Sequence, residues 1–167
     1  MRVKIGTYPD YYYWLDRLFG WNPKQKISVR IDKHDTWSMD HTLAPIILPM
    51  LVQLKETKHS APMVDMKDVP KELRATKKQL DAYGKGGGTD PKHFERWDWI
   101  LDEMIWAFDQ KNKDDWEDEY YGPFIEDPNK RLSGHFEWID HKGLDTHQER
   151  MNKAFELFGK HFENLWD

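Results

Sequence analysis

The chain has no cysteine among its 167 residues, and this absence removes several kinds of chemistry at once. Without thiols there is no disulfide scaffold, no cysteine nucleophile and no thiolate-bound metal centre. Any site must therefore be built from carboxylates, imidazoles, amines, hydroxyls and aromatic rings.

Long apolar runs are also absent. The longest, LAPIILPMLVQL, has 12 residues and contains two prolines, so it is too short to span a bilayer. The first residues, MRVKIGTYPDYYYW, lack the apolar segment of a signal peptide. We therefore expect a cytoplasmic protein that does not act at a membrane.

The motifs of several enzyme classes are missing as well. There is no G-x-S-x-G nucleophile motif, no H-E-x-x-H zinc motif and no dinucleotide-binding fingerprint. The glycine run GKGGGTDP does not match a phosphate loop, because Lys85 is followed by Gly86 rather than by serine or threonine. These absences favour a protein without a cofactor and without catalysis, but acid–base work by a carboxylate pair stays open.

Aromatic residues, by contrast, are abundant: they make up 14% of the chain and include nine tryptophans. Disordered chains lack aromatics, so this content predicts a packed fold. The length fits a single domain over residues 1–167, with a flexible connection at about 59–92, where prolines and glycines interrupt the helical pattern.

Charge is distributed unevenly along the chain. Residues 1–34 carry seven Lys/Arg against three Asp, whereas residues 95–127 carry twelve Asp/Glu against three Lys/Arg. The acidic part repels phosphate, so we expect no general binding of nucleic acid. A local basic pocket for a small anion remains compatible with this pattern.

The periodicity of apolar residues predicts a predominantly helical α+β fold. Helical spacing and strand-like alternation predict three main helices at about 38–58, 92–110 and 146–165, a short helix at 9–20, and a small antiparallel sheet from strands near 2–6, 26–32 and, as a further candidate, 135–140.

Local signals refine two of these helices. Asp35, Thr36 and Ser38 are candidate N-caps of the first helix, and Thr146 with Glu149 forms a capping box for the last. The core-facing stripes of the last two helices are predicted to be Phe94, Trp97, Leu101, Met104 and Phe108, and Met151, Phe155, Phe158, Phe162 and Leu165.

The helix at 92–110 carries large aromatic side chains on a second face. Trp99, Asp102, Glu103 and Trp106 share the side opposite the core stripe. Two tryptophans on a polar face are expected to be covered by the rest of the fold, by a second subunit or by a ligand.

The strand alternation indicates a candidate anion site. Pairing of the first two strands would gather basic side chains on one face, beside the start of a helix and a tryptophan. A solvated face with edge lysines explains the same pattern. The candidate ligand-binding residues are Arg2, Lys4, Lys26, Arg30, Trp37, His41, Lys58, Arg74, Trp99 and Trp106.

A metal site is a weaker hypothesis. Asp40 and His41 are adjacent on a helix and point about 100° apart, which is unsuitable for a chelating pair. A hard cation would need the fold to bring distant carboxylates together. The ligands would come from Asp32, Asp35, Asp40, His41, Asp102 and Glu103.

Three long segments carry a resemblance to known sequences. The segments IDKHDTWSMDHTLAPIILPMLVQLKETKHSAPMVDMKDVPKELR, HFERWDWILDEMIWAF and QERMNKAFELFGKHFENLWD resemble an uncharacterised family of small proteins encoded by tailed bacteriophages, notably those of marine bacteria. This resemblance implies a location in the cytoplasm of the infected bacterial host, and it transfers no catalytic residue.

In that setting three functions are ranked. The first is a non-catalytic, homo-oligomeric binding protein that sequesters an anionic nucleotide-like host signal, such as a cyclic or ADP-ribose-type nucleotide, and so counters host defence. The second is an inhibitor of a host protein or a virion-assembly factor that binds through a Trp-rich surface. The third is a metal-dependent hydrolase built on the Asp/His cluster.

Overall fold

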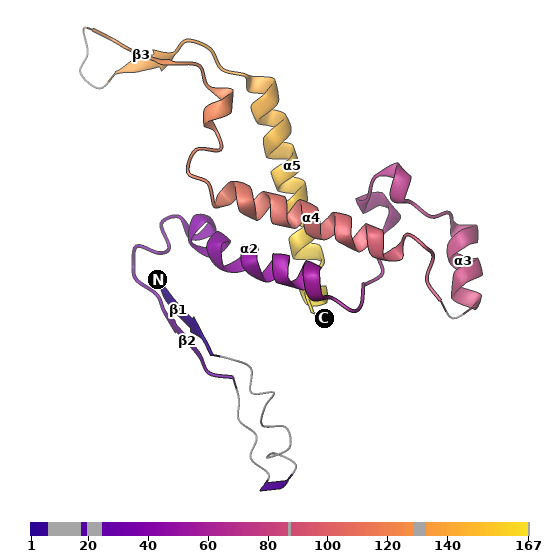
Figure 1. Ribbon diagram of the computed structural model, residues 1–167. Helices are drawn as coiled ribbons and strands as arrows, with labels where there is room; N and C mark the ends of the chain where they lie inside the picture. The colour runs from indigo at the N-terminus through magenta and orange to yellow at the C-terminus, as the bar shows by residue number, and fades with distance from the viewer. Residues whose placement is uncertain (7–17, 20–24, 87, 129–132, 167) are drawn as a thin grey trace. The chain divides into compact units, whose positions relative to one another are not determined.

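The computed structural model describes residues 1–6, 18–19, 25–86, 88–128 and 133–166, which form two compact units, Met1–Thr42 and Leu43–Asp167 (Figure 1). Across these residues the fold is predominantly helical α+β, as the periodicity predicts, with four α-helices and two antiparallel two-stranded sheets. The short helix expected at 9–20 falls largely outside the described residues. In the part of the chain described, no helix is long and apolar enough to cross a membrane.

The first unit contains the predicted antiparallel ribbon. Strand β1, Arg2–Ile5, pairs with strand β2, Ile27–Arg30, in a register that sets Arg2 opposite Arg30 and Val3 opposite Val29. Residues directly opposite each other point to the same face of a ladder, so the ribbon has one basic face and one apolar face. Neither face is buried: Ile5 is 53% and Val29 is 54% exposed, and Val3 is half-buried.

A closed turn at residues 32–38 connects this ribbon to helix α2, Met39–Thr57. The Asp35 carboxylate accepts hydrogen bonds from the backbone N–H of Asp32 and from the N-terminal ammonium, and the Thr36 hydroxyl donates to the carbonyl of Lys33. The prediction that Asp35 and Thr36 cap the helix is therefore wrong, because both side chains bond within the turn. Ser38 holds the N-cap position, since its carbonyl accepts the bond from the backbone N–H of Thr42.

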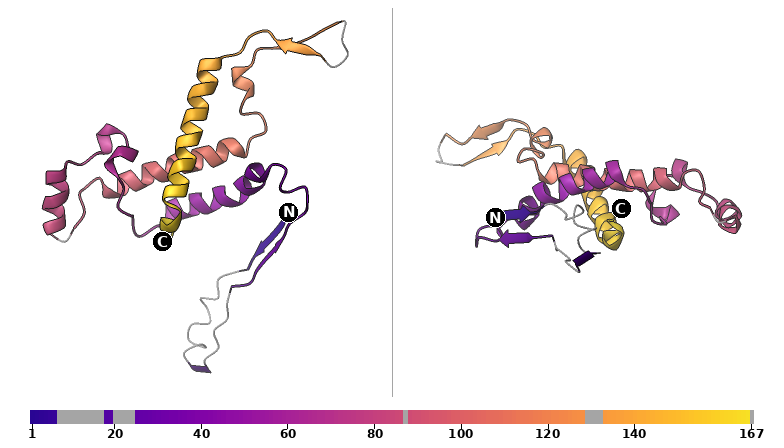
Figure 2. Two further views of the ribbon diagram at one scale, coloured as in Figure 1. Left: turned by 180° about the vertical axis from the view of Figure 1, so that it is seen from behind. Right: turned by 60° about the horizontal axis from the view of Figure 1, so that its bottom comes forward.

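The core of the second unit is built around helix α4, His93–Lys111. Helix α5, His141–Lys160, crosses α4, as Figures 1 and 2 show, and α2 contributes to the same hydrophobic cluster. Helix α2 is continuous through Pro45 and Pro49. The buried members of the cluster are Ala44, Leu51, Val64, Val69, Trp97, Ile100, Leu101, Met104, Phe108 and Leu157.

Two residues of the predicted stripes are exposed rather than buried. Phe94 is 46% exposed and Phe162 is 64% exposed, while Ile100 and Leu157 are fully buried. Both exposed residues lie at helix ends: Phe94 is in the first turn of α4, and Phe162 follows the end of α5. The helical repeat continues there in the sequence, but no element in the described part of the chain covers these two side chains.

The segment 59–92, expected as a flexible connection, contains the 3₁₀ helices Met66–Asp68 and Lys71–Leu73 and the α-helix α3, Lys77–Lys85. It is attached to α4 through Arg96, whose side chain is completely buried. The Arg96 guanidinium donates two hydrogen bonds to the Asp90 carboxylate and a third to the carbonyl of Leu73, at 3.0 Å. A buried arginine needs such partners, because an unpaired charge is very costly away from water.

A second small sheet precedes α5. Strand β3, Phe124–Glu126, pairs with β4, Gly134–Phe136, and an isolated bridge joins Tyr121 to Ile139. The strand expected at 135–140 is thus present, but it pairs with 124–126 rather than with the N-terminal ribbon. Its partner lies in an acidic, turn-rich stretch that did not predict a strand.

Helix α5 begins six residues earlier than the capping box predicts. Asp140 is its N-cap, with its side chain accepting a 2.9 Å hydrogen bond from the backbone N–H of Gly143. Thr146 lies inside the helix, where its hydroxyl donates to the carbonyl of Lys142. The capping box is wrong because the antiparallel ladder carries the chain directly into Asp140, whose backbone N–H donates to the carbonyl of Tyr120.

The buried Asp90–Arg96 pair yields a prediction for stability. Asp90→Ala should lower the free energy of unfolding by roughly 3–5 kcal/mol, because it leaves a buried guanidinium without its carboxylate. Chemical denaturation measures this loss. Asp102→Ala is the matched control: it removes a carboxylate whose ion pair with Lys55 is half-exposed, so it should cost less than about 1 kcal/mol. Equal losses in the two variants would contradict the anchoring role of Arg96.

Two glycines of α5 provide a second, matched prediction. A Cβ at Gly143 would lie 2.3 Å from Oδ2 of Asp140, whereas a Cβ at Gly159 would meet nothing within 4 Å. Gly143→Ala should therefore disturb the N-cap and destabilise the protein by about 1 kcal/mol. Gly159→Ala should stabilise it by roughly 0.5–1 kcal/mol, because alanine is the better helix former. Thermal unfolding of the two variants tests this opposition, and a change of the same sign in both would refute it.

Candidate functional site

The first candidate site is the basic face of the β1–β2 ribbon, which comprises Arg2, Lys4, Lys26 and Arg30. All but Lys26 lie in the two strands, and Lys26 is joined to the ladder by the hydrogen bond from the Gly6 backbone N–H to its carbonyl, at 2.9 Å. Among the described residues, no carboxylate forms an ion pair with any of these four cations. The predicted gathering of positive charge on one face is therefore present in the structure.

The register adds a feature that alternation alone did not predict. Arg2 and Arg30 are direct cross-strand partners, and Lys4 pairs with Ser28. Like charges placed directly opposite each other destabilise a sheet by roughly 0.2–1 kcal/mol. Two neighbouring guanidinium groups without a carboxylate form a doubly charged donor surface, and each guanidinium can hold a phosphate or carboxylate through two parallel hydrogen bonds.

Trp37 belongs to the same unit as the basic face. Trp37 is 79% exposed, and its ring meets the His34 ring edge to face, with the ring centroids 4.5 Å apart. Trp37 is therefore available as a stacking surface. His41 is half-buried in the first turn of α2, with its Nε2 3.8 Å from the Asp40 carboxylate.

The other predicted ligand-binding cations lie in the second unit. The ammonium of Lys58 forms an ion pair with Asp98 at 2.5 Å and donates to the carbonyl of Lys55, which attaches the end of α2 to α4. Nε of Arg74 donates to the carbonyl of Val69. Arg74 also lines a small cavity of about 200 Å³ with Tyr83 and Lys92. Lys58 and Arg74 therefore belong to a different unit from the basic face.

The second face of α4 is covered by the chain itself. Trp99 is half-buried and packs against the hydrophobic cluster. The guanidinium of Arg150, from α5, lies over the Trp106 ring, 3.8 Å from its centroid, and the same guanidinium forms two 2.9 Å hydrogen bonds with the Glu103 carboxylate. We considered that the rest of the fold, a second subunit or a ligand would cover this face, and the structure shows that the rest of the fold covers it.

The metal hypothesis gains no geometric support. Within the described residues, no three His, Asp or Glu side chains form a group that could hold a metal ion. Asp35 is engaged in its turn, Asp102 with Lys55, and Glu103 with Arg150.

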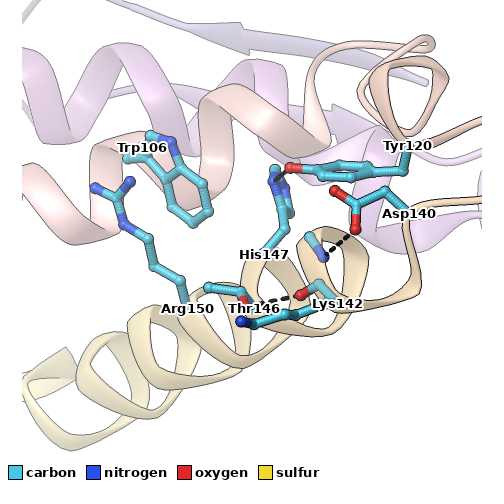
Figure 3. Close-up of a pocket in the computed structure, with 8 residues that line it drawn as sticks. Trp106, Tyr120, Asp140, Lys142, Thr146, His147 and Arg150 are labelled. Atoms are coloured by element: carbon cyan, nitrogen blue, oxygen red, sulfur yellow. Dashed lines mark hydrogen bonds between the residues drawn. The ribbon is translucent and has the colours of Figure 1, made fainter.

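The structure shows a second candidate site that the sequence did not predict. An open pocket of about 440 Å³ lies between α4, the 3₁₀ turn Asp118–Tyr120 and the first half of α5 (Figure 3). We call it the His147 pocket. It is lined by Trp106, Tyr120, Asp140, Lys142, Gly143, Thr146, His147 and Arg150.

His147 is the central side chain of this pocket. Its ring stacks on Trp116, with the ring centroids 4.7 Å apart and the planes 19° apart, and it also contacts Trp106 and Tyr120. The Tyr120 hydroxyl and Nδ1 of His147 share a 2.8 Å hydrogen bond. Whichever of these two atoms donates, Nε2 of His147 is buried and has no hydrogen-bond partner within the described chain.

This environment shifts the titration of both partners. Burial lowers the pKa of His147, because the charged imidazolium loses its solvation, and the positive charges of Arg150 and Lys113 lower it further, against the opposing effect of Glu119. Burial, followed by the neighbouring Glu119 carboxylate, raises the pKa of Tyr120 to about 12. At neutral pH the pair is therefore an uncharged imidazole and an uncharged phenol.

The pKa of His147 predicts how stability depends on pH. Because the pKa in the folded state is lower than the ~6.5 of an unfolded histidine, the unfolded chain binds the proton first as the pH falls. The free energy of unfolding should be constant just above about pH 6.5 and should decrease below it. His147→Phe keeps a ring in place and should show a shallower decrease, measured by urea denaturation between about pH 8 and 5. An unchanged slope in this variant would contradict the assignment.

His161 contributes to the same pH dependence. It is only 3% exposed, and burial, followed by the charge of Lys160, lowers its pKa. The His147→Phe variant should therefore retain the part of the pH dependence of stability that comes from His161.

The residues of the His147 pocket come from three elements that are far apart in the sequence, so no local pattern identifies them. Trp116, Tyr120 and His147 are separated by up to 31 positions, and they meet because the β3–β4 ladder returns the chain to Asp140. In the comparisons with known proteins, no family, no curated protein and no solved structure matches the chain. The geometry of the two candidate sites is therefore the basis for any functional inference, and the phage-family resemblance stays a prediction.

Proposed function

We propose that this protein binds and sequesters a small anionic, nucleotide-like ligand without transforming it, and that the basic face of the β1–β2 ribbon holds the phosphate. The observation that supports this proposal is the direct cross-strand pairing of Arg2 with Arg30, with no carboxylate to neutralise either charge among the described residues. A bound phosphate would convert this repulsion into attraction, with up to four N–H donors directed at its oxygens.

The same unit offers a surface for the base of a nucleotide. The Trp37 indole is exposed, and a purine ring can stack on it while the phosphate contacts the basic face. We therefore restrict the proposed ligand-binding set to Arg2, Lys4, Lys26, Arg30 and Trp37. Lys58, Trp99 and Trp106 are omitted because their charge or ring faces are engaged within the second unit.

The resemblance to tailed-phage proteins suggests where and why such a ligand would be bound. The resemblance to tailed-phage proteins favours action in the cytoplasm of an infected bacterium, where removal of a cyclic or ADP-ribose-type signal would counter host defence. Sequestration without catalysis fits the lack of catalytic motifs in the sequence. A homo-oligomer would place several basic faces in one particle and raise the effective affinity.

Arg30→Glu tests the anion site directly. In the unchanged protein, ADP-ribose or cyclic AMP at about 100 times its Kd should raise the melting temperature by roughly 5–10 °C, whereas adenosine, which lacks phosphate, should not. Arg30→Glu should abolish the rise, because a carboxylate would face Arg2 and repel phosphate. Differential scanning fluorimetry measures the shift, and mass spectrometry after denaturation should recover the ligand intact.

The matched control is Lys77→Glu, which makes the same change in charge at an exposed position in the second unit. It should keep the ligand-dependent shift. If no phosphate-bearing ligand shifts the melting temperature, or if Arg30→Glu responds like the unchanged protein, the proposed anion site is wrong.

Protein binding is the second candidate function, as an inhibitor of a host protein or a virion-assembly factor. It is favoured by the apolar face of the same ribbon, where Ile5 is 53% and Ile27 is 62% exposed. Exposed apolar side chains gathered on one face are typical of a surface that binds another protein. Ile27→Lys separates the two candidates: it should abolish a protein complex detected by size-exclusion chromatography with light scattering, while leaving any nucleotide shift intact.

A further inference from the structure

We infer that one face of the β3–β4 ladder is a docking surface for an extended, arginine-rich peptide segment of a partner protein. We call it the aromatic face, and its rings are those of Phe124, Phe136 and Trp138. It belongs to the second unit and shares no residue with the proposed anion site on the ribbon. The inference rests on the position of these rings, on the open edges of the ladder and on the negative charge around it.

The register of the ladder places the three rings on the same side. Phe124 pairs directly with Phe136, and their rings are in contact, with the centroids 5.4 Å apart. The pairing continues to Trp138, whose carbonyl accepts a 2.8 Å hydrogen bond from the backbone N–H of Gly122. Side chains two residues apart lie on one face of a strand, so Trp138 follows Phe136. Its indole packs on the Gly122 backbone, where a Cβ would be 2.4 Å from the ring.

About half of each ring remains accessible. Phe124 is 53%, Phe136 is 40% and Trp138 is 51% exposed. Within the second unit the ladder extends beyond the first turn of α5, away from α4 (Figure 1). Aromatic side chains gathered on an exposed face are typical of a surface that binds another protein, and tryptophan is among the residues that contribute most to such binding.

The open edges of the ladder favour an extended partner. Among the described residues, β3 and β4 pair only with each other, so each strand has one edge without a strand partner. An extended segment can add to such an edge through backbone hydrogen bonds, and its alternate side chains then lie over the aromatic face. Each strand has only three residues, so side chains must supply most of the affinity.

The charge around the aromatic face favours a cationic partner. Residues 114–142 carry nine Asp/Glu against three Lys/Arg. Glu126 lies on the same face as the rings, two residues from Phe124, and it forms no ion pair among the described residues. A peptide with positive charge is therefore attracted to this face, and an acidic peptide is repelled.

Arginine suits this surface better than lysine does. A planar guanidinium can stack on an aromatic ring and hydrogen-bond a carboxylate at the same time. The second unit contains this arrangement elsewhere, since the Arg150 guanidinium lies 3.8 Å from the centroid of the Trp106 ring and bonds to the Glu103 carboxylate. The aromatic face presents rings and the Glu126 carboxylate, and an arginine of the partner would supply the guanidinium.

Fluorescence anisotropy of the full chain with three labelled peptides tests the inference. Each peptide has about seven residues and blocked termini, and it alternates threonine with arginine, lysine or glutamate. The arginine peptide should bind saturably at one site per chain. The lysine peptide should bind about threefold or more weakly, because an ammonium stacks less well on a ring, and the glutamate peptide should not bind.

Two matched pairs of variants locate the site. Trp138→Ala should weaken binding of the arginine peptide by about tenfold or more, whereas Trp166→Ala, at a tryptophan that is 59% exposed, should leave it unchanged. Glu126→Gln keeps the shape and removes one charge, so it should weaken binding by about threefold. Its control is Glu163→Gln, at an exposed position outside the ladder. Thermal unfolding verifies that all four variants are folded.

Absence of binding by the arginine peptide, equal binding of the arginine and glutamate peptides, or an unchanged affinity in Trp138→Ala would overturn the inference. A dimer of the chain that Trp138→Ala dissociates, detected by light scattering, would show that a second copy covers the face and would also overturn it. Arg30→Glu should leave peptide binding unchanged, which separates failure here from failure of the proposed function.

Discussion

The burial of helix α4 on both of its faces is the constraint on which the second unit depends. One face contributes Trp97, Leu101 and Met104 to the hydrophobic cluster, and the other is covered by Arg150 over Trp106. The buried Arg96 of α4 attaches the segment 59–92 through its hydrogen bonds to Asp90. The hydrophobic cluster, the segment 59–92 and the His147 pocket therefore all depend on α4. Partial loss of α4 would therefore release the core, this segment and the His147 pocket together.

This packing also determines which candidate groups can meet a ligand. Lys58 and Trp106 have polar or aromatic partners within the second unit, so their conspicuous positions in the sequence reflect structure rather than binding. Among the described residues, no carboxylate forms an ion pair with the cations of the ribbon, and Trp37 is 79% exposed although its ring contacts His34. Separating side chains that have partners within the fold from those that do not narrows the ten candidate ligand-binding residues to a site within one unit.

Much of the fold could be predicted because its signals are local. Alternation in RVKI and ISVR predicts the ribbon, and helical spacing predicts α2, α4 and α5 within a few residues. The start of α5 was missed because Asp140 and Thr146 are both good caps, and only the tertiary ladder from Tyr120 selects the first. Phe94 and Phe162 were misplaced because periodicity does not reveal where neighbouring elements end.

The two candidate sites could be predicted to different degrees, because the first depends on a local pattern and the second depends on tertiary contacts. The basic face follows from alternation, but the opposition of Arg2 and Arg30 is a property of register, and residues 7–24 between the strands gave no signal that fixes it. The His147 pocket needs Trp116, Tyr120 and His147 to meet through a hairpin whose first strand has only three residues. Such a meeting depends on tertiary contacts that no local pattern encodes.

The central claim is that the protein retains a phosphate-bearing small molecule and leaves it chemically intact. Native mass spectrometry of the full chain, purified rapidly from bacterial cells that produce it, followed by mass spectrometry of the denatured sample, tests this claim most directly. If the protein sequesters its ligand, the native mass should exceed that of the bare chain, and denaturation should release one phosphate-bearing molecule of defined mass. A bare chain, or a chain that carries a stoichiometric metal ion and no organic ligand, would contradict it.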